Sequence, residues 1–454
     1  MGAPEGESVT SLPLARQVPF DPSARSYVDF GEFHPLEFTG WQDETMSWKD
    51  GCYIHGGLSF LIRTVEVSGP DTMRLLSDLA VNSFDRFPVG SAKHVIFCSE
   101  RGNVMQHGMA LRVAEQRVRS YDLSPYLVFV ALSGEYDVEV TDVTDDRFLF
   151  QLGGPKSLEI VERAAQQDLH DVPFMKFTQA TIAGHEVDVL RMGMGGTLSY
   201  EVHGSIEGAH AVYAAIMSAG ESFGIRKLGS LAYCCNHTEN GFPQAGSHFP
   251  LAWLDNPEFA KWAEDILPPF ARDSSAIPRG TLTQDIRELF RNPVELGWGH
   301  MVSFDHEFVG KAALQKIMAQ PVRRIVTLRW NADDILDVFR SYLEKGELFR
   351  YMEFPFDFFA GSPGNSRYMA DALMRDGRTV GVAMRPTYTL YSREVISLAV
   401  VDIDESQLGT ELTILWGDWD GPTKEIRAVV SRYPYLDLPS NQDFDLDTIP
   451  RFSA

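Results

Sequence analysis

Two short stretches of the chain carry side chains that could do chemistry. The first is a glycine-rich turn at residues 191–196, which runs into an alternating segment that ends at Glu201. The second is residues 229–242, which contain Tyr233. A glutamate carboxylate can accept two parallel N–H donors from a planar ring. A tyrosine phenol, whose pKa is about 10, can exchange a proton with another phenolic oxygen at little energetic cost.

Both side chains also have a structural interpretation. A glutamate in an alternating strand usually lies on the solvent-facing side of the sheet. A tyrosine among apolar residues is commonly a core residue whose hydroxyl finds a hydrogen-bond partner. Neither stretch matches a common metal-binding or phosphate-binding motif.

The hydrophobic pattern predicts the elements that must position these side chains. Residues 60–68 alternate as a strand does, and Gly69-Pro70-Asp71 opens a helix predicted at 72–79. The longest apolar run, residues 126–132, predicts a buried strand. Further helices are predicted at 157–165 and 208–223, and further strands at 93–99, 109–113, 148–152, 186–190, 200–203, 323–330, 395–402, 411–416 and 426–432.

The composition is that of an ordinary globular protein with a strong negative charge. Lys and Arg total 40 against 63 Asp and Glu, which gives a formal net charge of −23. Such a surface repels nucleic acid phosphates and anionic lipids, so no nucleic acid or membrane partner is predicted. No apolar run approaches the ~20 residues that span a bilayer, and the first residues lack the basic and apolar regions of a signal peptide. A cytoplasmic location is therefore predicted.

The cysteines predict neither a metal site nor a disulfide. Cys52, Cys98, Cys234 and Cys235 show no metal-type spacing, and adjacent cysteines do not easily form a relaxed disulfide. We expect reduced thiols and no bound metal.

Composition and pattern divide the chain into four parts. Residues 1–40 lack periodicity and are predicted to be an N-terminal arm, whereas residues 41–321 are predicted to form two packed α+β domains. Closely spaced strands in residues 322–436 predict a small C-terminal β-barrel, interrupted by an aromatic-rich insertion at 335–372. Residues 437–454 contain Pro, Ser and many Asp residues and are predicted to be a solvated acidic tail.

Five blocks, in the same order along the chain, resemble the glycine-cleavage aminomethyltransferase (T-protein) superfamily. They are 68–76 with the 93–104 hairpin, 150–155, 193–201 with 229–241, 295–304 with 308–314, and 397–401 with 409–412. The run Gly229-Ser230-Leu231-Ala232-Tyr233 further resembles the Gly-Ser-x-Ala-Tyr pattern of one branch, the tetrahydrofolate-dependent aryl-methyl-ether O-demethylases of the vanillate, syringate and 3-O-methylgallate type. The resemblance implies an α+β fold of three domains around a central cavity that binds folate. Residues 41–321 would form the folate-binding region, and the C-terminal domain would be a β-barrel.

The resemblance also implies roles for particular residues. Tyr233 corresponds to the tyrosine implicated as catalytic in these demethylases, and its phenol would protonate the phenolic leaving oxygen. Glu201 corresponds to a glutamate that binds the edge of the pterin through a two-point contact. The cofactor pocket would be completed by Gln151, Phe242, Met194 and Trp298.

The chain departs from the family pattern at several predicted site positions. His107 stands where the glycine-cleavage enzyme carries an acid; it is predicted to be either a proton relay or a satisfied polar residue. In vanillate-type enzymes an arginine resembles the anchor of the substrate carboxylate. The matching stretch places Asp122 there, with Arg119 as a substitute if the register shifts. His248 is predicted to shape the substrate pocket, and the presence of a substrate carboxylate stays open.

The predicted function is transfer of the O-methyl group of a vanillate-like or syringate-like methoxyarene to N5 of tetrahydrofolate, which gives 5-methyltetrahydrofolate and a phenol. The enzyme would act as a monomer or homodimer. Two enzymatic alternatives stay open: the glycine-cleavage aminomethyltransferase itself, and a demethylase for a small aliphatic methyl donor. A non-enzymatic alternative is the folate-binding iron–sulfur assembly factor of the same superfamily. Its hallmark cysteine motif is replaced here by residues 242–248, which contain no cysteine.

Overall fold

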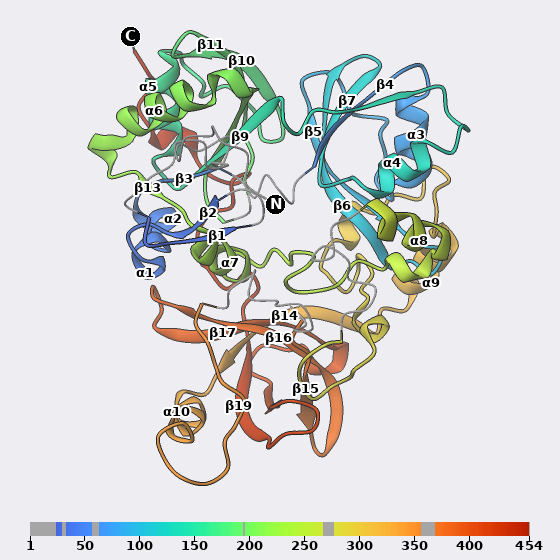
Figure 1. Cartoon of the computed structure of the whole chain (residues 1–454), viewed down its shortest axis with the longest axis vertical. Coiled ribbons are helices and arrows are strands. Elements are labelled where there is room, and N and C mark those ends of the chain that lie inside the picture. The colour runs from blue at the N-terminus through green and yellow to red at the C-terminus, as the bar shows by residue number, and fades with distance from the viewer. Residues whose placement is uncertain are drawn as a thin grey trace, which may run out of the picture.

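Three lobes built on β-sheets surround the middle of the molecule (Figure 1). The computed structural model describes residues 24–29, 33–56, 63–193, 196–266, 277–355 and 368–453. Their strands form a six-stranded sheet, a five-stranded sheet, a closed six-stranded barrel and a separate two-stranded ribbon. Helices accompany the sheets, so the predicted α+β class with a C-terminal β-barrel is confirmed.

The six-stranded sheet forms the upper left lobe of Figure 1 together with α5 (Ser157–Ala165) and α6 (Ala209–Gly220). The two helices pack against one another, and alternate residues such as Phe148, Phe150 and Leu152 are buried in the shared core. In order across the sheet, the strands are β10 (Phe177–Ile182), β11 (His185–Leu190), β12 (Ser199–Ser205), β9 (Arg147–Gly153), β3 (Tyr53–His55) and β13 (Arg226–Lys227).

The five-stranded sheet forms the upper right lobe, with α3 (Thr72–Leu79) beside it. The hairpin at one edge of this sheet and the strand next to it carry the side chains that this lobe contributes to the middle of the molecule. α8 (Pro257–Ile266) and α9 (Lys311–Ala319) lie below this lobe. In order, the strands are β5 (Ala92–Cys98), β6 (Val104–Ala114), β7 (Arg117–Tyr121), β4 (Thr64–Ser68) and β8 (Glu139–Asp142).

Residues 126–132, predicted as a buried strand, form a helix instead. α4 covers Tyr126–Ala131 and begins directly after Pro125. It packs against α8, where the ring centroids of Phe129 and Phe259 are 5.3 Å apart. A continuous apolar run fits a covered helix as well as a buried strand, so hydrophobicity alone could not decide.

The barrel closes because its first strand pairs with strands on both sides, and all its pairings are antiparallel. α10 (Ala332–Arg340) follows the first strand and lies against the last one. In order around the barrel, the strands are β14 (Arg323–Trp330), β17 (Glu394–Asp402), β16 (Arg378–Thr389), β15 (Asp371–Arg375), β18 (Glu411–Trp416) and β19 (Lys424–Ser431).

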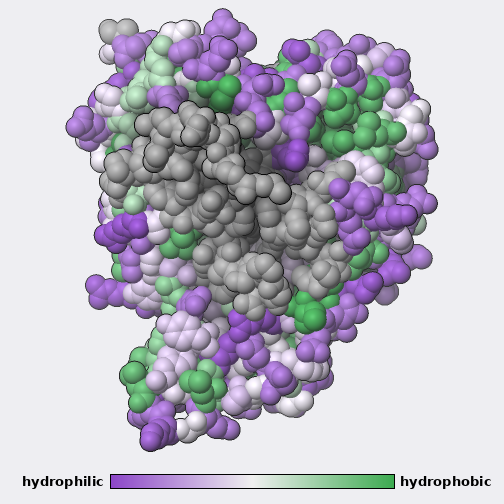
Figure 2. All heavy atoms as spheres, viewed as in Figure 1, coloured by the Kyte–Doolittle hydropathy of each residue, from purple (hydrophilic) through white to green (hydrophobic). Residues whose placement is uncertain are grey.

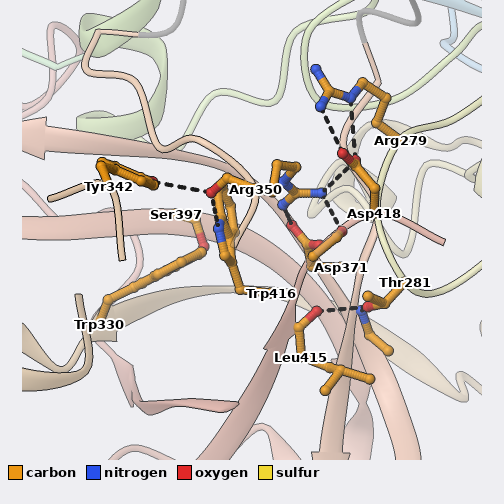
Figure 3. Close-up of polar contacts among 12 residues, drawn as sticks. Arg279, Thr281, Trp330, Tyr342, Arg350, Asp371, Ser397, Leu415, Trp416 and Asp418 are labelled. Carbon is orange, nitrogen blue, oxygen red and sulfur yellow. Dashed lines mark hydrogen bonds and ion pairs between the residues drawn. The ribbon is translucent and has the colours of Figure 1, made fainter. Parts of the chain in front are cut away.

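A buried ion pair joins the segment after α10 to the barrel (Figure 3). Arg350 Nη2 donates to Asp371 Oδ2 at 2.5 Å, and the guanidinium carbon lies 3.7 Å from the ring centroid of Trp416. Burial raises the pKa of Asp371 to about 6, an effect that the guanidinium opposes. This part of the predicted insertion 335–372 is therefore fixed to the barrel; residues 356–367 lie outside the described residues.

Helix α7 (Ser230–Glu239) lies near the centre of the molecule and carries Tyr233. It contacts the barrel strands β16 and β17, and also α1 (Trp41–Glu44) and β2 (Phe33–Glu37), which pairs with β1 (Ser26–Asp29). Its N-cap is Gly229, where an added Cβ would lie 2.2 Å from the carbonyl oxygen of Leu36, so only glycine fits. After the helix, Gly241 adopts the left-handed conformation with φ of 65°.

Two buried carboxylates hold the ends of α7. Glu44 accepts the backbone N–H of Gly229 at 2.7 Å and three more backbone N–H groups just before α1. At the other end, Glu239 accepts the indole N–H of Trp48 at 3.0 Å and the ammonium of Lys49 at 2.5 Å. The Lys49 and Glu239 side chains are 2% and 1% exposed. α1 and α2 (Ser47–Asp50) thus fix α7 from both ends.

The C-terminal residues, predicted as a solvated tail, instead pack against the six-stranded sheet. We call residues 436–453 the C-terminal strap. Ile449 is buried in the core of that sheet and accepts a hydrogen bond from His170 Nε2 at 3.0 Å. Asn441 Nδ2 donates to the carbonyl of Ser199 at 2.8 Å. The strap's aspartates face solvent whereas Asn441 and Ile449 face the protein. The prediction of a solvated tail, which was based on composition, is therefore wrong for these residues.

The face shown in Figure 2 is mostly hydrophilic around its rim. Apolar spheres at the lower left lie where Figure 1 places α10, and Leu336 of that helix is 58% exposed. Among the residues that the structure describes, no helix is long and apolar enough to cross a membrane.

Replacing Lys49 with methionine should lower the free energy of unfolding by about 3 kcal/mol, because it leaves the Glu239 carboxylate buried without its cation. Urea denaturation followed by tryptophan fluorescence measures this loss. The matched control is Arg63→Met, which breaks an ion pair with Asp142 whose side chains are 52% and 46% exposed. The control should cost less than about 1 kcal/mol, and equal losses for the two variants would contradict the assignment.

Candidate active site

The two open sheets and α7 border a cavity of about 960 Å³. β5, β6 and β7 contribute side chains from one sheet and β9 and β12 from the other, and α7, residues 300–303 and the C-terminal strap form further parts of the described wall. Six residues predicted from the sequence line it: His107, Asp122, Gln151, Glu201, Tyr233 and Phe242.

Glu201 and Gln151 face one another on the paired strands β12 and β9. Gln151 Nε2 donates to Glu201 Oε1 at 2.9 Å, and His203 Nε2 donates to Glu201 Oε2 at 3.0 Å. Because a carboxylate only accepts, His203 Nδ1 can accept from the Tyr121 hydroxyl, which lies 2.8 Å away. Each carboxylate oxygen therefore has one protein donor and a remaining lone pair, and Glu201 is held in one orientation.

The same pair leaves acceptors for a ligand. Gln151 Oε1 is buried and has no hydrogen-bond partner among the described residues. A buried acceptor without a donor costs about 1–3 kcal/mol, so a ligand that brings N–H groups is favoured here. The aminopyrimidinone edge of a pterin carries such groups, and the Glu201–Gln151 pair therefore fits tetrahydrofolate.

The glycine-rich turn packs closely against Ser199 and Asn240. An added Cβ at Gly193 would lie 2.2 Å from Ser199 Cβ, and one at Gly196 would lie 2.4 Å from Asn240 Oδ1. Both glycines permit a tight turn at the cavity wall. Met194, predicted as a cofactor contact, lies outside the described residues, as does Gly195.

Tyr233 lies between two histidine rings. Its ring centroid is 4.7 Å from that of His55 and 4.5 Å from that of His237. Burial raises the pKa of Tyr233 well above its usual value, and the nearby Asp122 carboxylate raises it further. The phenol is therefore protonated at neutral pH, and it is available to a ligand because Tyr233 lines the cavity.

His107 belongs to a second group of rings along the cavity. Its Nδ1 lies 3.2 Å from Nε2 of His94. Burial lowers the pKa of His107 well below its usual range and that of His94 to about 4, so both rings are uncharged at pH 7. Trp298 packs against His107 with ring centroids 4.8 Å apart, and Phe242 packs against Trp298 at 5.7 Å. Phe242 lines the cavity, whereas Trp298 supports it from behind.

Two predicted substrate residues do not reach the cavity. Arg119 Nε pairs with Glu66 at 2.9 Å and its Nη1 with Asp188 at 3.3 Å, which occupies the guanidinium. His248 is buried, and its Nδ1 accepts the backbone N–H of Gln244 at 3.1 Å. Neither side chain belongs to the described lining, so the structure does not support them as substrate contacts.

Several lining residues were missed from the sequence. His94 lies on β5 and His107 on the paired strand β6, in a register that places them diagonally on one face of the hairpin. Two histidines on the same face of a predicted hairpin were a signal that could have been used. Asn441 of the strap, by contrast, gave no local signal, because its partners lie 242 and 250 residues away.

Comparison with known proteins identifies the family. Residues 29–250 match the family described as the GCVT N-terminal domain. The chain is 38% identical to sesamin methylene transferase from a Sinomonas strain, over 93% of this chain and 95% of that protein. It is 29% identical to syringate O-demethylase from a Sphingobium strain, over 88% of this chain and 89% of that protein. Among solved structures, aminomethyltransferase T of the glycine cleavage system from Bartonella henselae matches with a TM-score of 0.64 and 16% identity, over 93% of this chain and 96% of that one.

The chain therefore belongs to the GCVT family, the superfamily of the tetrahydrofolate-dependent aminomethyltransferases. The structural match shows the same fold over nearly the whole chain. The resemblance predicted from the sequence is confirmed, together with an enzymatic function and the use of tetrahydrofolate.

Substituting Glu201→Gln should raise the Kd for tetrahydrofolate about ten- to a hundred-fold, because a charged acceptor of pterin N–H groups is lost. Isothermal titration calorimetry under anaerobic conditions measures this change. Glu307→Gln is the control, since the Glu307 side chain is 92% exposed. An unchanged Kd for Glu201→Gln would show that this carboxylate does not contact the pterin.

Proposed function

We propose that the protein is a tetrahydrofolate-dependent O-demethylase that removes the methyl group of a methoxylated aromatic compound, with a vanillate-like or syringate-like ring. The products would be a phenol and 5-methyltetrahydrofolate. One observation carries the proposal: a single cavity presents both the Glu201–Gln151 acceptor pair and the buried, protonated phenol of Tyr233. The name of the relative syringate O-demethylase supports it.

In this proposal the chain binds and orients both reactants. Tetrahydrofolate, when bound, supplies N5 as the acceptor of the methyl group. Glu201 and Gln151 would fix the pterin by accepting its N–H groups, with His203 and Tyr121 keeping the carboxylate in place. Holding two reactants in line can account for several kcal/mol of rate acceleration. The packed rings of Phe242 and its neighbours would exclude water from the ether.

Tyr233 would hold a proton at its hydroxyl and donate it to the phenolic oxygen as the C–O bond breaks. A phenol is matched in pKa to a phenolic leaving group, so the transfer is nearly thermoneutral. The burial that raises the pKa of Tyr233 would act in the same direction on a phenol bound beside it. Methylation of N5 would release its proton, which balances the proton that Tyr233 gives up. His107 and His94, which are uncharged, in contact and part of the same cavity wall, would serve as the relay that returns this proton to Tyr233.

A second candidate reaction is favoured by the relative at 38% identity, which is named as a methylene transferase. The donor would then be a methylenedioxyarene, and one carbon would leave two phenolic oxygens in turn. The folate product distinguishes the two reactions, because a methylene group gives 5,10-methylenetetrahydrofolate.

For the setting, we propose that the enzyme acts in the cytoplasm as a monomer or homodimer, on a small arene and folate alone. The formal net charge of −23 supports this proposal, because it disfavours binding to nucleic acids and anionic membranes.

The test is incubation of the purified protein with tetrahydrofolate and a panel of donors, with folates and phenols followed by mass spectrometry. The panel contains vanillate, syringate, 3-O-methylgallate, guaiacol, 1,3-benzodioxole and glycine-cleavage substrates. Formation of 5-methyltetrahydrofolate from a methoxyarene is the expected result. If only benzodioxole is consumed, the second candidate is correct. If no donor in the panel is consumed although tetrahydrofolate still binds, both candidate reactions are excluded for these donors.

Tyr233→Phe should lower kcat about 10²- to 10⁴-fold, because the general acid is removed. The Kd for tetrahydrofolate should stay within about three-fold of wild type, because the pterin contacts assigned to Glu201 and Gln151 are untouched. Single-turnover kinetics and calorimetry measure the two quantities. Turnover that survives in Tyr233→Phe would move the proton donor to another group.

A further inference from the structure

Asp122 is held in the cavity by a costly backbone conformation. Its φ of 61° lies in the left-handed region, which residues other than glycine rarely adopt. Gln106 Nε2 donates to its carbonyl at 2.6 Å and stabilises the turn. At Gly108, an added Cβ would lie 2.1 Å from the carbonyl oxygen of Tyr121, so only glycine lets the strands approach there. Several residues therefore cooperate to place this carboxyl group on the cavity wall.

The Asp122 carboxyl has no cationic partner in the structure as described. Among the described lining residues it and Glu201 are the acids, and Lys93 is the one lysine or arginine. The Lys93 ammonium donates to the carbonyl of Ser83 and lies 5.2 Å from the ring centroid of Phe84, and the carboxylates that act on it are those of Asp305 and Asp85 rather than Asp122.

Among the other basic side chains near the site, His300 is exposed, with its Nδ1 3.2 Å from the carbonyl oxygen of Gly297, and the following four are buried. Arg119 is bound to its two acids, as described above. Burial lowers the pKa values of His94 and His237 to about 4 and that of His107 further below its usual range, so these rings are uncharged. Burial also raises the pKa of Asp122 to about 7, as expected for a carboxyl group without a counter-charge.

This distribution of charge bears on which aromatic substrates the cavity can bind. A benzoate-type substrate whose carboxylate lay beside Asp122 would bring two acids together at a point where, among the described lining residues, no lysine or arginine pairs with Asp122. Desolvating such a charge without a partner costs several kcal/mol. The same ring without the carboxylate avoids that cost.

We infer that the site selects aryl ethers that carry no carboxylate, and that Asp122 is the residue that excludes the carboxylated ones. The inference rests on the proposed function and narrows its substrate class to uncharged methoxyarenes. Asp122 would act by repelling the carboxylate of the substrate. Repulsion of the unwanted ligand is a common device of specificity.

Two matched pairs of arenes test the inference: guaiacol with vanillate, and 2,6-dimethoxyphenol with syringate. Each acid differs from its neutral counterpart by one carboxylate. Binding is measured by calorimetry at pH 8 on the full chain saturated with folic acid, whose oxidised ring cannot accept a methyl group. In the wild type, each neutral arene should bind at least about ten-fold more tightly than its acid, which corresponds to ~1.4 kcal/mol.

In Asp122→Asn, the preference for the neutral arene should shrink to about three-fold or less, chiefly because the acid binds more tightly. Asparagine tolerates the left-handed conformation as aspartate does, and the Gln106 contact is to the backbone, so the variant should fold. Thermal unfolding checks this. The matched control is Asp420→Asn, which removes the same charge from an exposed turn and should keep the wild-type preference.

Acids that bind wild type as tightly as their neutral counterparts would overturn the inference and leave demethylation standing. A preference that Asp122→Asn does not change would overturn the role of Asp122. If no arene of either kind binds while the folate does, the inference falls together with the proposed function. Turnover in the donor panel distinguishes this outcome from the first two, because a methoxyarene is demethylated in those and not in this one.

Discussion

The burial of α7 is the constraint on which the rest of this structure depends. Nearly every side chain of this helix is removed from solvent, including polar ones, so its ends cannot rely on water for hydrogen bonds. Glu44 supplies the acceptor at the N-terminus, and the Lys49–Glu239 pair fixes the C-terminal end. Because α7 also contacts the ribbon strand β2 and the barrel, its position is fixed from several sides, and with it the position of Tyr233 in the cavity wall.

The cavity combines few charges with many polarisable rings. Uncharged histidines and aromatic side chains make up much of its wall, and its two carboxyl groups are held by different means. Glu201 is oriented by side-chain donors on neighbouring strands, whereas Asp122 is oriented by its own backbone. One carboxylate is thus prepared for N–H donors, and the other has no donor among the residues that the structure describes. Such unequal environments for two acids allow one site to hold a cofactor and sort substrates.

Sequence reasoning was accurate where a pattern is local. The helix predicted at 157–165 and the strand predicted at 323–330 occur with those bounds, since amphipathic periodicity and turn residues are contained within each segment. It was wrong for residues 126–132, where a uniform apolar run carries no periodicity, and for the C-terminal strap, whose partners are distant.

The same distinction between local patterns and distant partners applies to the residues of the candidate site. Residues tied to a motif, such as Tyr233 and Glu201, come together in one cavity. Arg119 does not join them, because the acids that bind its guanidinium lie on β4 and β11, 53 and 69 residues away. A side chain whose role depends on distant partners cannot be assigned from its neighbours in the sequence.

The C-terminal strap has a consequence for the order in which the molecule is assembled. Arg191, beside the glycine-rich turn, bonds to Asn441 across 250 residues, and the barrel is made between them. Closing so long a loop costs chain entropy that only the finished lobes can offset. Chain entropy therefore favours completing this part of the cavity wall late in folding, after the six-stranded sheet has formed and can receive the strap. The six-stranded sheet expressed without the strap would keep most of its core and lack the strap residues 440–442 that complete this part of the cavity wall.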